Sequence, residues 1–308
     1  MTSIVALGGG HGLSATLRAL RTLDIEPIAV VGTGDDGGSS GRLREHLGVP
    51  PPGDLRMALV ALVGDGSGST LWPRVLHHRF GGTGDVEGHA LGNLLLVALW
   101  EETGDIVTGL DRLGRVLEAR GRVLPNSIDP VVVAARVRTD DGVVEVVGQA
   151  RLTATRGEIE SLRLVPEDPR ACCEAVSAIE AASAIVLGPG SWYTSVLPHL
   201  LVPGIRNALK RSSAKRILVL NAAPQAGETE GFAAHAYLEA WDGLFPGIGL
   251  DVVLADPRSV ADTARLAAAA SRVGAEVHLG QLLVVDGYAH HPDRLAAALG
   301  GALPAATR

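Results

Sequence analysis

Five polar, glycine-rich segments contain residue types that could bind a ligand. The first has the sequence GGGHGLS at Gly8–Ser14 and lies between an apolar run and a segment with helical spacing. Free backbone N–H groups and the helix dipole favour an anion at such a position. The predicted phosphate-binding residues here are Gly9, Gly10, His11 and Gly12. A plain strand-to-helix turn is the alternative interpretation.

The second segment, GDDGGSSGR at Gly34–Arg42, combines two carboxylates, two hydroxyls and an arginine with four glycines. Its aspartates could accept sugar hydroxyls or hold Mg²⁺, and its hydroxyls and backbone N–H groups could form an anion nest. The predicted ligand residues are Asp35, Asp36, Gly38, Ser39 and Ser40. A solvated loop with an Asx turn is the alternative.

Two further loops follow buried strands, with GPGSWYTS at Gly188–Ser195 and a polar stretch at Asn221–Thr229. In an open parallel sheet, ligands bind outside the carboxyl ends of the strands, where the strand order reverses. We therefore predict that residues 8–12 and 188–195 face one crevice. The predicted ligand residues are Gly188, Gly190, Ser191, Tyr193, Ser195, Asn221, Gln225 and Thr229. For each of them singly, a structural role is the alternative.

The fifth segment, GHALGN, opens an apolar helix and places His89 and Asn93 four residues apart. Residues at this spacing share one helix face, so both are predicted to contact one ligand. Asp54 follows a run of prolines and a glycine, and we expect it to cap a helix rather than to take part in chemistry. Arg56, one turn later, is a weaker phosphate candidate.

The sequence excludes several common kinds of ligand-binding and catalytic site. The only lysines, Lys210 and Lys215, do not follow glycine, so a Walker A loop is absent. Leu13 stands where the dinucleotide fingerprint needs its third glycine. Ser191 lies outside a GxSxG motif, and no histidines or cysteines have zinc-site spacing. We predict no required cofactor and no metal, unless Asp35 or Asp36 holds Mg²⁺.

The elements that would position these loops alternate between strand and helix. Apolar runs at 4–7, 28–31, 184–187, 217–220 and 252–254 predict strands, with helical patterns between them. This alternation is typical of an α/β fold with a doubly wound, mostly parallel, Rossmann-like sheet in one domain over 1–308. A helical cap is expected at about 54–118, and a small antiparallel β insert at about 121–165. Residues 32–41 are expected to form one long loop.

Composition narrows the class of protein. The 308 residues are 46% hydrophobic and 20% charged, which is typical of a globular protein. With 27 Lys and Arg against 34 Asp and Glu, the chain lacks the basic surface that nucleic-acid binding requires. No apolar run approaches the roughly 20 residues of a membrane span. The two adjacent cysteines cannot join distant elements, so we expect a cytoplasmic protein with no membrane span.

Taken in order from residue 4 to about residue 255, these motifs resemble the gluconeogenesis factor family (YvcK-like) within the CofD-like superfamily. They are GGGHGLS, GDDGGSSGRLR, PPGDLRMALVAL, GHALGN, GPGSWYTS and the 221–229 loop. The resemblance implies a UDP-sugar ligand such as UDP-N-acetylglucosamine and a role in cell shape and envelope synthesis during gluconeogenic growth. It also implies that residues 9–12 lie near the diphosphate, with 35–40 in the same pocket and 188–195 as its opposite wall.

Two functions follow from the resemblance. The first is a regulatory protein that binds a nucleotide sugar and whose ligand-bound state is recognised by protein partners. The second is a Mg²⁺-dependent CofD-like transferase acting on a nucleotide-activated phospholactate-type substrate. The GPGS sequence, in place of one like GPSNP, favours the regulatory branch. The sequence leaves the choice of sugar, the partners and homo-oligomer formation open.

Overall fold

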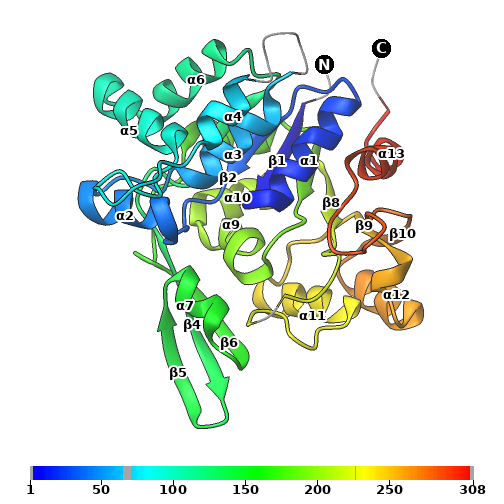
Figure 1. Cartoon of the computed structure of the whole chain (residues 1–308). Coiled ribbons are helices and arrows are strands. Elements are labelled where there is room, and N and C mark those ends of the chain that lie inside the picture. Colours follow the sequence, from blue (N-terminus) through cyan, green and yellow to red (C-terminus); the bar gives the residue numbers. More distant parts are fainter. Residues whose placement is uncertain (1–2, 65–70, 226, 306–308) are drawn as a thin grey trace.

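The computed structural model describes residues 3–64, 71–225 and 227–305 and contains two β-sheets (Figure 1). The larger sheet has seven parallel strands in the order β10-β9-β8-β7-β1-β2-β3. Its strands are β1 (Ile4–Gly8), β2 (Ile28–Val31), β3 (Arg122–Pro125), β7 (Ala184–Leu187), β8 (Lys215–Val219), β9 (Val252–Ala255) and β10 (Glu276–Leu279). The predicted doubly wound α/β fold is confirmed.

Helices cover both faces of this sheet, so successive strand residues enter two different cores. Val5 and Leu7 of β1 lie in one core, and Ile4 and Ala6 lie in the other. Burial on both faces is why the strands are continuous apolar runs. The core of Ile4 and Ala6 contains residues of α1 (Gly10–Thr22), α2 (Gly38–Leu47), α3 (Gly53–Leu62), α4 (Leu71–His77), α5 (Leu91–Thr103), α6 (Ile106–Val116) and α13 (Pro292–Ala302).

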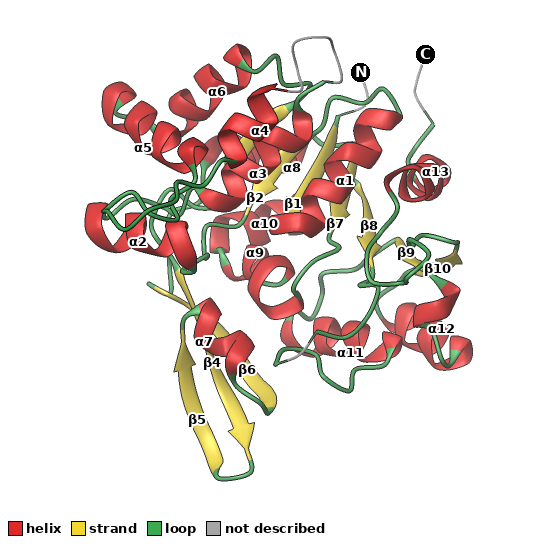
Figure 2. Cartoon of the chain, viewed as in Figure 1, coloured by secondary structure: helices red, strands yellow, loops and turns green. Residues whose placement is uncertain are grey.

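The opposite face is covered by helices from the second half of the chain (Figure 2). They are α8 (Cys173–Ala181), α9 (Pro198–Leu201), α10 (Pro203–Arg211), α11 (Ala234–Leu244) and α12 (Thr263–Arg272). Two short helices follow β7 and β9: a π-helix at Trp192–Val196 and a 3-10 helix at Pro257–Ser259. Within the described residues, no helix is long and apolar enough to cross a membrane.

The strand order reverses between β1 and β7. From β1 the sheet continues to β2 and β3 on one side, and from β7 it continues to β8, β9 and β10 on the other. The loops that leave β1 and β7 therefore diverge, and the crevice between them is the expected ligand position in such a sheet. Part of each loop lies there, since His11 and Gly12 line the same cavity as Pro189 and Gly190.

A three-stranded antiparallel sheet in the order β5-β4-β6 projects from the main body, in green in Figure 1. Its elements are β4 (Val132–Thr139), β5 (Gly142–Val147), α7 (Gln149–Ala154) and β6 (Glu158–Val165). The predicted antiparallel β insert is confirmed, and β4 and β5 form a hairpin whose turn lies at residues 140–142. The small sheet begins at Val132, because β3 pairs with β2 in the large sheet.

Two local predictions near the first two glycine-rich segments are wrong. The loop expected at 32–41 ends at Gly37, since α2 begins at Gly38 with a φ of +48° that glycine adopts readily. Asp54 does not cap α3, because that helix begins at Gly53 with Pro52 at the N-cap position and without a side-chain cap. The Asp54 side chain turns instead toward the first turn of α1.

Candidate functional site

A cavity of about 330 Å³, here called the switch-point cavity, lies outside the carboxyl ends of β1, β7 and β8. Its lining comes from the two glycine loops, the loop after β8 and a C-terminal segment. The lining residues are His11, Gly12, Ala15, Pro189, Gly190, Asn221, Ala222, Ala223, Pro224, Gln225, Tyr288, Ala289 and His290. The structure thus brings together five predicted ligand residues: His11, Gly12, Gly190, Asn221 and Gln225.

On one wall of this cavity, side-chain amides join the loop after β7 to the loop after β8. The Oδ1 atom of Asn221 accepts a hydrogen bond from the backbone N–H of Gly190 at 2.9 Å, and its Nδ2 donates to Gln225 at 3.3 Å. Gln225 Nε2 in turn donates to the hydroxyl of Ser191 at 3.1 Å. The wall is therefore held in one arrangement before a ligand arrives, with amide groups that can recognise a base or a sugar.

Close backbone packing explains the glycine at position 12. A Cβ atom there would lie 2.0 Å from the carbonyl oxygen of Pro189. The Thr16 hydroxyl adds a hydrogen bond of 2.7 Å to the carbonyl of Gly188. Gly12 thus allows α1 to approach the loop after β7, which closes the crevice to the size of a small ligand.

The N-terminus of α1 faces a carboxyl group. Gly9 is the N-cap and Gly10 has a φ of +56°. The Asp54 carboxyl accepts a hydrogen bond from the backbone N–H of Gly10. Burial, followed by the negative charge of Asp35, raises the pKa of Asp54 to about 7, although the Gly10 hydrogen bond and Arg56 oppose this. Asp54 therefore changes charge near neutral pH at the predicted phosphate position.

The adjacent aspartates Asp35 and Asp36 point to different partners. Asp35 lies near Asp54, and its Oδ1 accepts the backbone N–H of Gly37 at 3.0 Å. Asp36 Oδ1 accepts the backbone N–H of Ala150 at 2.9 Å, in the first turn of α7. Asp35 thus faces the α1 terminus, whereas Asp36 holds the small sheet against α2.

Two carboxylates, those of Asp35 and Asp54, are the candidate ligands for a metal ion. Among the residues that the structure describes, no group of three or more His, Cys, Asp or Glu side chains could hold a metal. Mg²⁺, however, is commonly bound by one or two carboxylates together with waters and the phosphates of a ligand. Asp35 and Asp54 fit that requirement beside the α1 terminus.

Three of the predicted ligand residues, Ser39, His89 and Asn93, contact one another and do not line the switch-point cavity. Ser39 Oγ lies 3.0 Å from His89 Nδ1 and accepts a hydrogen bond of 3.0 Å from Asn93 Nδ2. His89 precedes α5, so the two side chains share a partner and not a helix face. Ser40 Oγ accepts the backbone N–H of Gly53 at 3.0 Å. These hydroxyls anchor the start of α2.

Arg56 extends this buried network. Its Nε donates to Asn93 Oδ1 at 2.8 Å, and its Nη1 contacts His77. Burial, together with the nearby charge of Arg79, lowers the pKa of Arg56 to about 10, so the guanidinium stays charged at neutral pH. Burial also lowers the pKa of His89. The network is thus a positively charged support behind α2.

The remaining predicted residues, Tyr193, Ser195 and Thr229, are buried. Thr229 Oγ1 accepts hydrogen bonds from the Gln225 backbone at 2.8 Å and from Tyr237 at 3.1 Å. Glu228 accepts the backbone N–H of Tyr193 at 3.2 Å and the Thr194 hydroxyl at 2.7 Å. These contacts fix the loops that carry Ser191 and Gln225.

The C-terminal wall of the cavity was missed by sequence reasoning. Asp256 accepts the backbone N–H groups of Leu282 at 2.8 Å and Leu283 at 3.0 Å, and it forms an ion pair with Arg258. Burial favours a raised pKa for Asp256, but hydrogen bonds from Arg258 and from the backbone of Leu282 and Leu283 outweigh it and hold the pKa well below its usual range. The clamp places Tyr288 at the cavity. The sequence feature that could have indicated this wall is Asp256, an aspartate directly after a buried strand.

Comparisons with known proteins agree with this fold. The sequence family described as 2-phospho-L-lactate transferase CofD matches residues 4–280. A Mycobacterium leprae protein assigned to the gluconeogenesis factors is 46% identical over 306 residues, which cover 97% of this chain and 85% of the relative. The gluconeogenesis factor of Bacillus subtilis is 38% identical over 262 residues, covering 84% and 80%.

A crystal structure of a UPF0052 family protein from Bacillus halodurans superimposes with a TM-score of 0.87 at 35% identity. The alignment covers 97% of this chain and 98% of that one. The resemblance seen in the loop motifs is confirmed by these matches, which extend beyond the motifs to nearly the whole chain. The chain belongs to the gluconeogenesis factor family and carries a domain of the CofD type.

Proposed function

We propose that this protein binds a nucleotide sugar, such as UDP-N-acetylglucosamine, in the switch-point cavity and acts as a regulator of carbon metabolism and envelope synthesis. The observation that carries the proposal is the position of that cavity between the loops after β1 and β7. The N-terminus of α1 would hold the diphosphate. The amides of Asn221 and Gln225 would recognise the base or the sugar.

The charge of Asp54 sets a condition on this binding. A charged carboxylate next to a diphosphate would repel it, so binding requires either a proton on Asp54 or a bound cation. A pKa of about 7 makes the protonated form available near neutral pH. A regulator that leaves its ligand chemically unchanged would act through partner proteins that recognise its ligand-bound form.

A second candidate, the Mg²⁺-dependent transferase, is favoured by the pairing of Asp35 with Asp54. When bound, Mg²⁺ would offset negative charge on the phosphate oxygens of a nucleotide-activated substrate. Asp35 and Asp54 would hold the ion, and the α1 terminus would orient the phosphates. The name of the matching family, a phospholactate transferase, points to the same chemistry.

The test is calorimetry with UDP-N-acetylglucosamine, UDP-glucose, GTP, GDP and NAD, each with and without Mg²⁺, followed by product analysis of every binder. UDP-sugar binding that leaves the ligand intact supports the regulator. Gln225→Ala should then weaken binding by about tenfold, as expected for the loss of one hydrogen bond to the ligand. The exposed Gln281, outside the cavity, provides the control Gln281→Ala. Guanine-nucleotide binding, or Mg²⁺-dependent breakdown of a ligand, would favour the transferase.

A further inference from the structure

A short hairpin between β10 and α13 forms one wall of the switch-point cavity (Figure 1). Leu283 and His290 form an antiparallel bridge, and the backbone N–H of Val284 donates to the carbonyl of Ala289 at 2.8 Å. We call residues 282–291 the C-terminal hairpin. The hairpin residues that line the cavity are Tyr288, Ala289 and His290.

The base of the C-terminal hairpin is fixed to the main sheet. Asp256, directly after β9, accepts the backbone N–H groups of the buried Leu282 and Leu283. At the cavity, the side chain of His290 forms a hydrogen bond with the backbone of Leu220, directly after β8. These contacts hold the hairpin beside the carboxyl ends of the strands, so its position is set before a ligand arrives.

The tip of the hairpin, by contrast, carries two unpacked side chains. Tyr288 is 82% exposed and Val285 is 92% exposed, the two highest values among the large hydrophobic side chains of the described residues. In the described structure the Tyr288 ring contacts no other aromatic ring, and its hydroxyl has no hydrogen-bond partner. Because Tyr288 both lines the cavity and faces solvent, it lies at the cavity mouth.

The rest of the lining shows which part of a ligand this ring suits. His11 and Gly12 bring the N-terminus of α1, an anion site, into the same cavity, and residues 222–224 add an apolar wall of two alanines and a proline. An exposed aromatic ring gains free energy when a planar, weakly polar face covers it. A nucleobase has such a face, and every base can stack on an aromatic side chain. The cavity thus combines an anion site with an aromatic surface, as nucleotide binding requires.

We propose that Tyr288 binds the nucleobase of the ligand by stacking on it at the mouth of the switch-point cavity. This role rests on the proposed function, the binding of a nucleotide sugar in that cavity. The ring can rotate onto the base, because no packing holds it in one rotamer. Tyr288 would thereby select ligands that carry a base over simple sugar phosphates, while Asn221 and Gln225 recognise polar groups.

The test is calorimetry on the full chain with UDP and with UDP-N-acetylglucosamine. Tyr288→Ala should weaken the binding of both ligands by about tenfold, as expected for the loss of one base–aromatic stack. Tyr288→Phe, which keeps the ring, should restore most of that affinity. The matched control is Val285→Ala, which removes the other exposed side chain of the tip, outside the cavity lining, and should bind like the wild type.

Tyr288→Trp gives a direct readout of the stack. A base that stacks on an indole ring quenches its fluorescence, so the emission of Tyr288→Trp should fall when UDP is added. The wild type, with its four native tryptophans, is the baseline, and its emission should fall less. Unchanged thermal unfolding midpoints establish that all four variants fold.

The outcomes separate this role from the proposed function. If the wild type binds neither UDP nor UDP-N-acetylglucosamine, the proposed function itself fails. If the wild type binds and Tyr288→Ala binds equally well, only the role of Tyr288 is overturned. Weakened binding of UDP-N-acetylglucosamine but not of UDP would show that the ring contacts the sugar instead of the base. An equal loss in Val285→Ala would show that the hairpin acts through its fold and not through stacking.

Discussion

At the scale of single residues, Asp54 links ligand binding to pH. Its pKa of about 7 means that the carboxyl is mostly neutral at pH 6 and mostly charged at pH 8. Without Mg²⁺, we expect the affinity for UDP-N-acetylglucosamine to fall about tenfold between these pH values, as the charged carboxylate repels the diphosphate. Calorimetry at both pH values measures this.

The matched variant is Asp54→Asn, which keeps an oxygen that can accept the Gly10 N–H but carries no charge. Its affinity for UDP-N-acetylglucosamine should be independent of pH and should equal or exceed that of the wild type at pH 8. A wild-type affinity that is the same at pH 6 and pH 8 would contradict the position of the diphosphate beside Asp54.

His199 should make the protein less stable in mild acid. Its buried Nε2 donates to the carbonyl of Gly8 at 3.1 Å, and burial lowers its pKa to about 4. The unfolded chain takes up this proton at a pKa near 6.5, so the stabilisation is complete above that pH and is lost as the pH falls toward 4. Between pH 7 and pH 5 this group should cost about 2 kcal/mol.

Urea unfolding at pH 7 and pH 5 measures that loss. In His199→Gln, whose amide can still donate to Gly8, the free energy of unfolding should fall by about 2 kcal/mol less than in the wild type. The exposed His46 supplies the control His46→Gln, which should behave like the wild type. An equal fall in the wild type and His199→Gln would show that His199 is not buried in its neutral form.

Individual side-chain directions were the least predictable feature. Asp35 and Asp36 are neighbours with the same chemistry, but Asp36 accepts the backbone N–H of Ala150, more than a hundred residues later, whereas Asp35 lies near Asp54. Asp54 has the sequence context of a helix cap, yet it turns toward Gly10 because α3 begins one residue earlier. Contacts of this kind depend on tertiary packing, which a single sequence does not reveal.

At the scale of elements, Gly12 and Gly243 give opposite predictions for the same substitution. Both lie in helices, and alanine is favoured over glycine in a helix interior by up to about 1 kcal/mol. In Gly243→Ala the new Cβ meets no atom within 4 Å, so this variant should be more stable than wild type. In Gly12→Ala it would collide with Pro189, so stability should fall by about 1–3 kcal/mol.

Thermal or urea unfolding of the two variants tests the close approach of α1 to the loop after β7. UDP-N-acetylglucosamine binding should weaken in Gly12→Ala and remain unchanged in Gly243→Ala. If Gly12→Ala is as stable as Gly243→Ala, the crevice between the two loops is wider than described.

Most elements could be predicted from local patterns, because buried parallel strands are short apolar runs and their helices have one apolar face. The Ile28–Val31 strand and the turn at residues 140–142 are examples. The start of α2 could not be predicted, because a helix beginning with Gly-Ser-Ser-Gly depends on its contacts. Only glycine fits at position 41, because a Cβ atom there would lie 2.1 Å from the carbonyl oxygen of Asp36.

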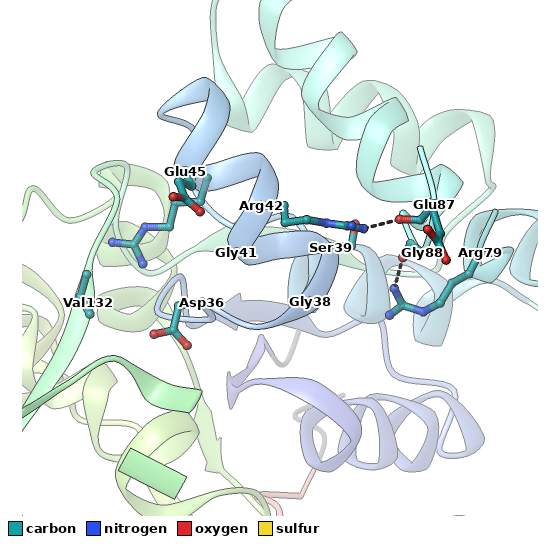
Figure 3. A pocket seen from close by; sticks show the side chains of 11 residues that line it. Asp36, Gly38, Ser39, Gly41, Arg42, Glu45, Arg79, Glu87, Gly88 and Val132 are labelled. Carbon is teal, nitrogen blue, oxygen red and sulfur yellow. Dashed lines mark hydrogen bonds between the residues drawn. The ribbon is translucent and has the colours of Figure 1, made fainter. Parts of the chain in front are cut away.

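At the scale of the whole molecule, the doubly wound topology fixes where the ligand site lies. Alternating strands and helices predicted the sheet, and its reversal between β1 and β7 brought the two glycine loops together. The C-terminal wall at residues 288–290 was missed, because its position depends on the clamp at Asp256 rather than on a local pattern. The cavity of about 800 Å³ beside α2, lined by residues from 36–45, from 79–88 and by Val132, likewise exists only once three distant segments have packed (Figure 3).

Hydrogen exchange measured by mass spectrometry, with and without saturating UDP-N-acetylglucosamine, tests the central claim most directly. Peptides that cover residues 9–15, 188–191 and 221–225 should exchange more slowly with the ligand present, because it would contact or order their backbone N–H groups. Peptides from the exposed strand β5 should be unchanged and serve as the internal control. Slower exchange confined to residues 38–45 and 79–88, or no change anywhere, would contradict binding at the switch-point cavity.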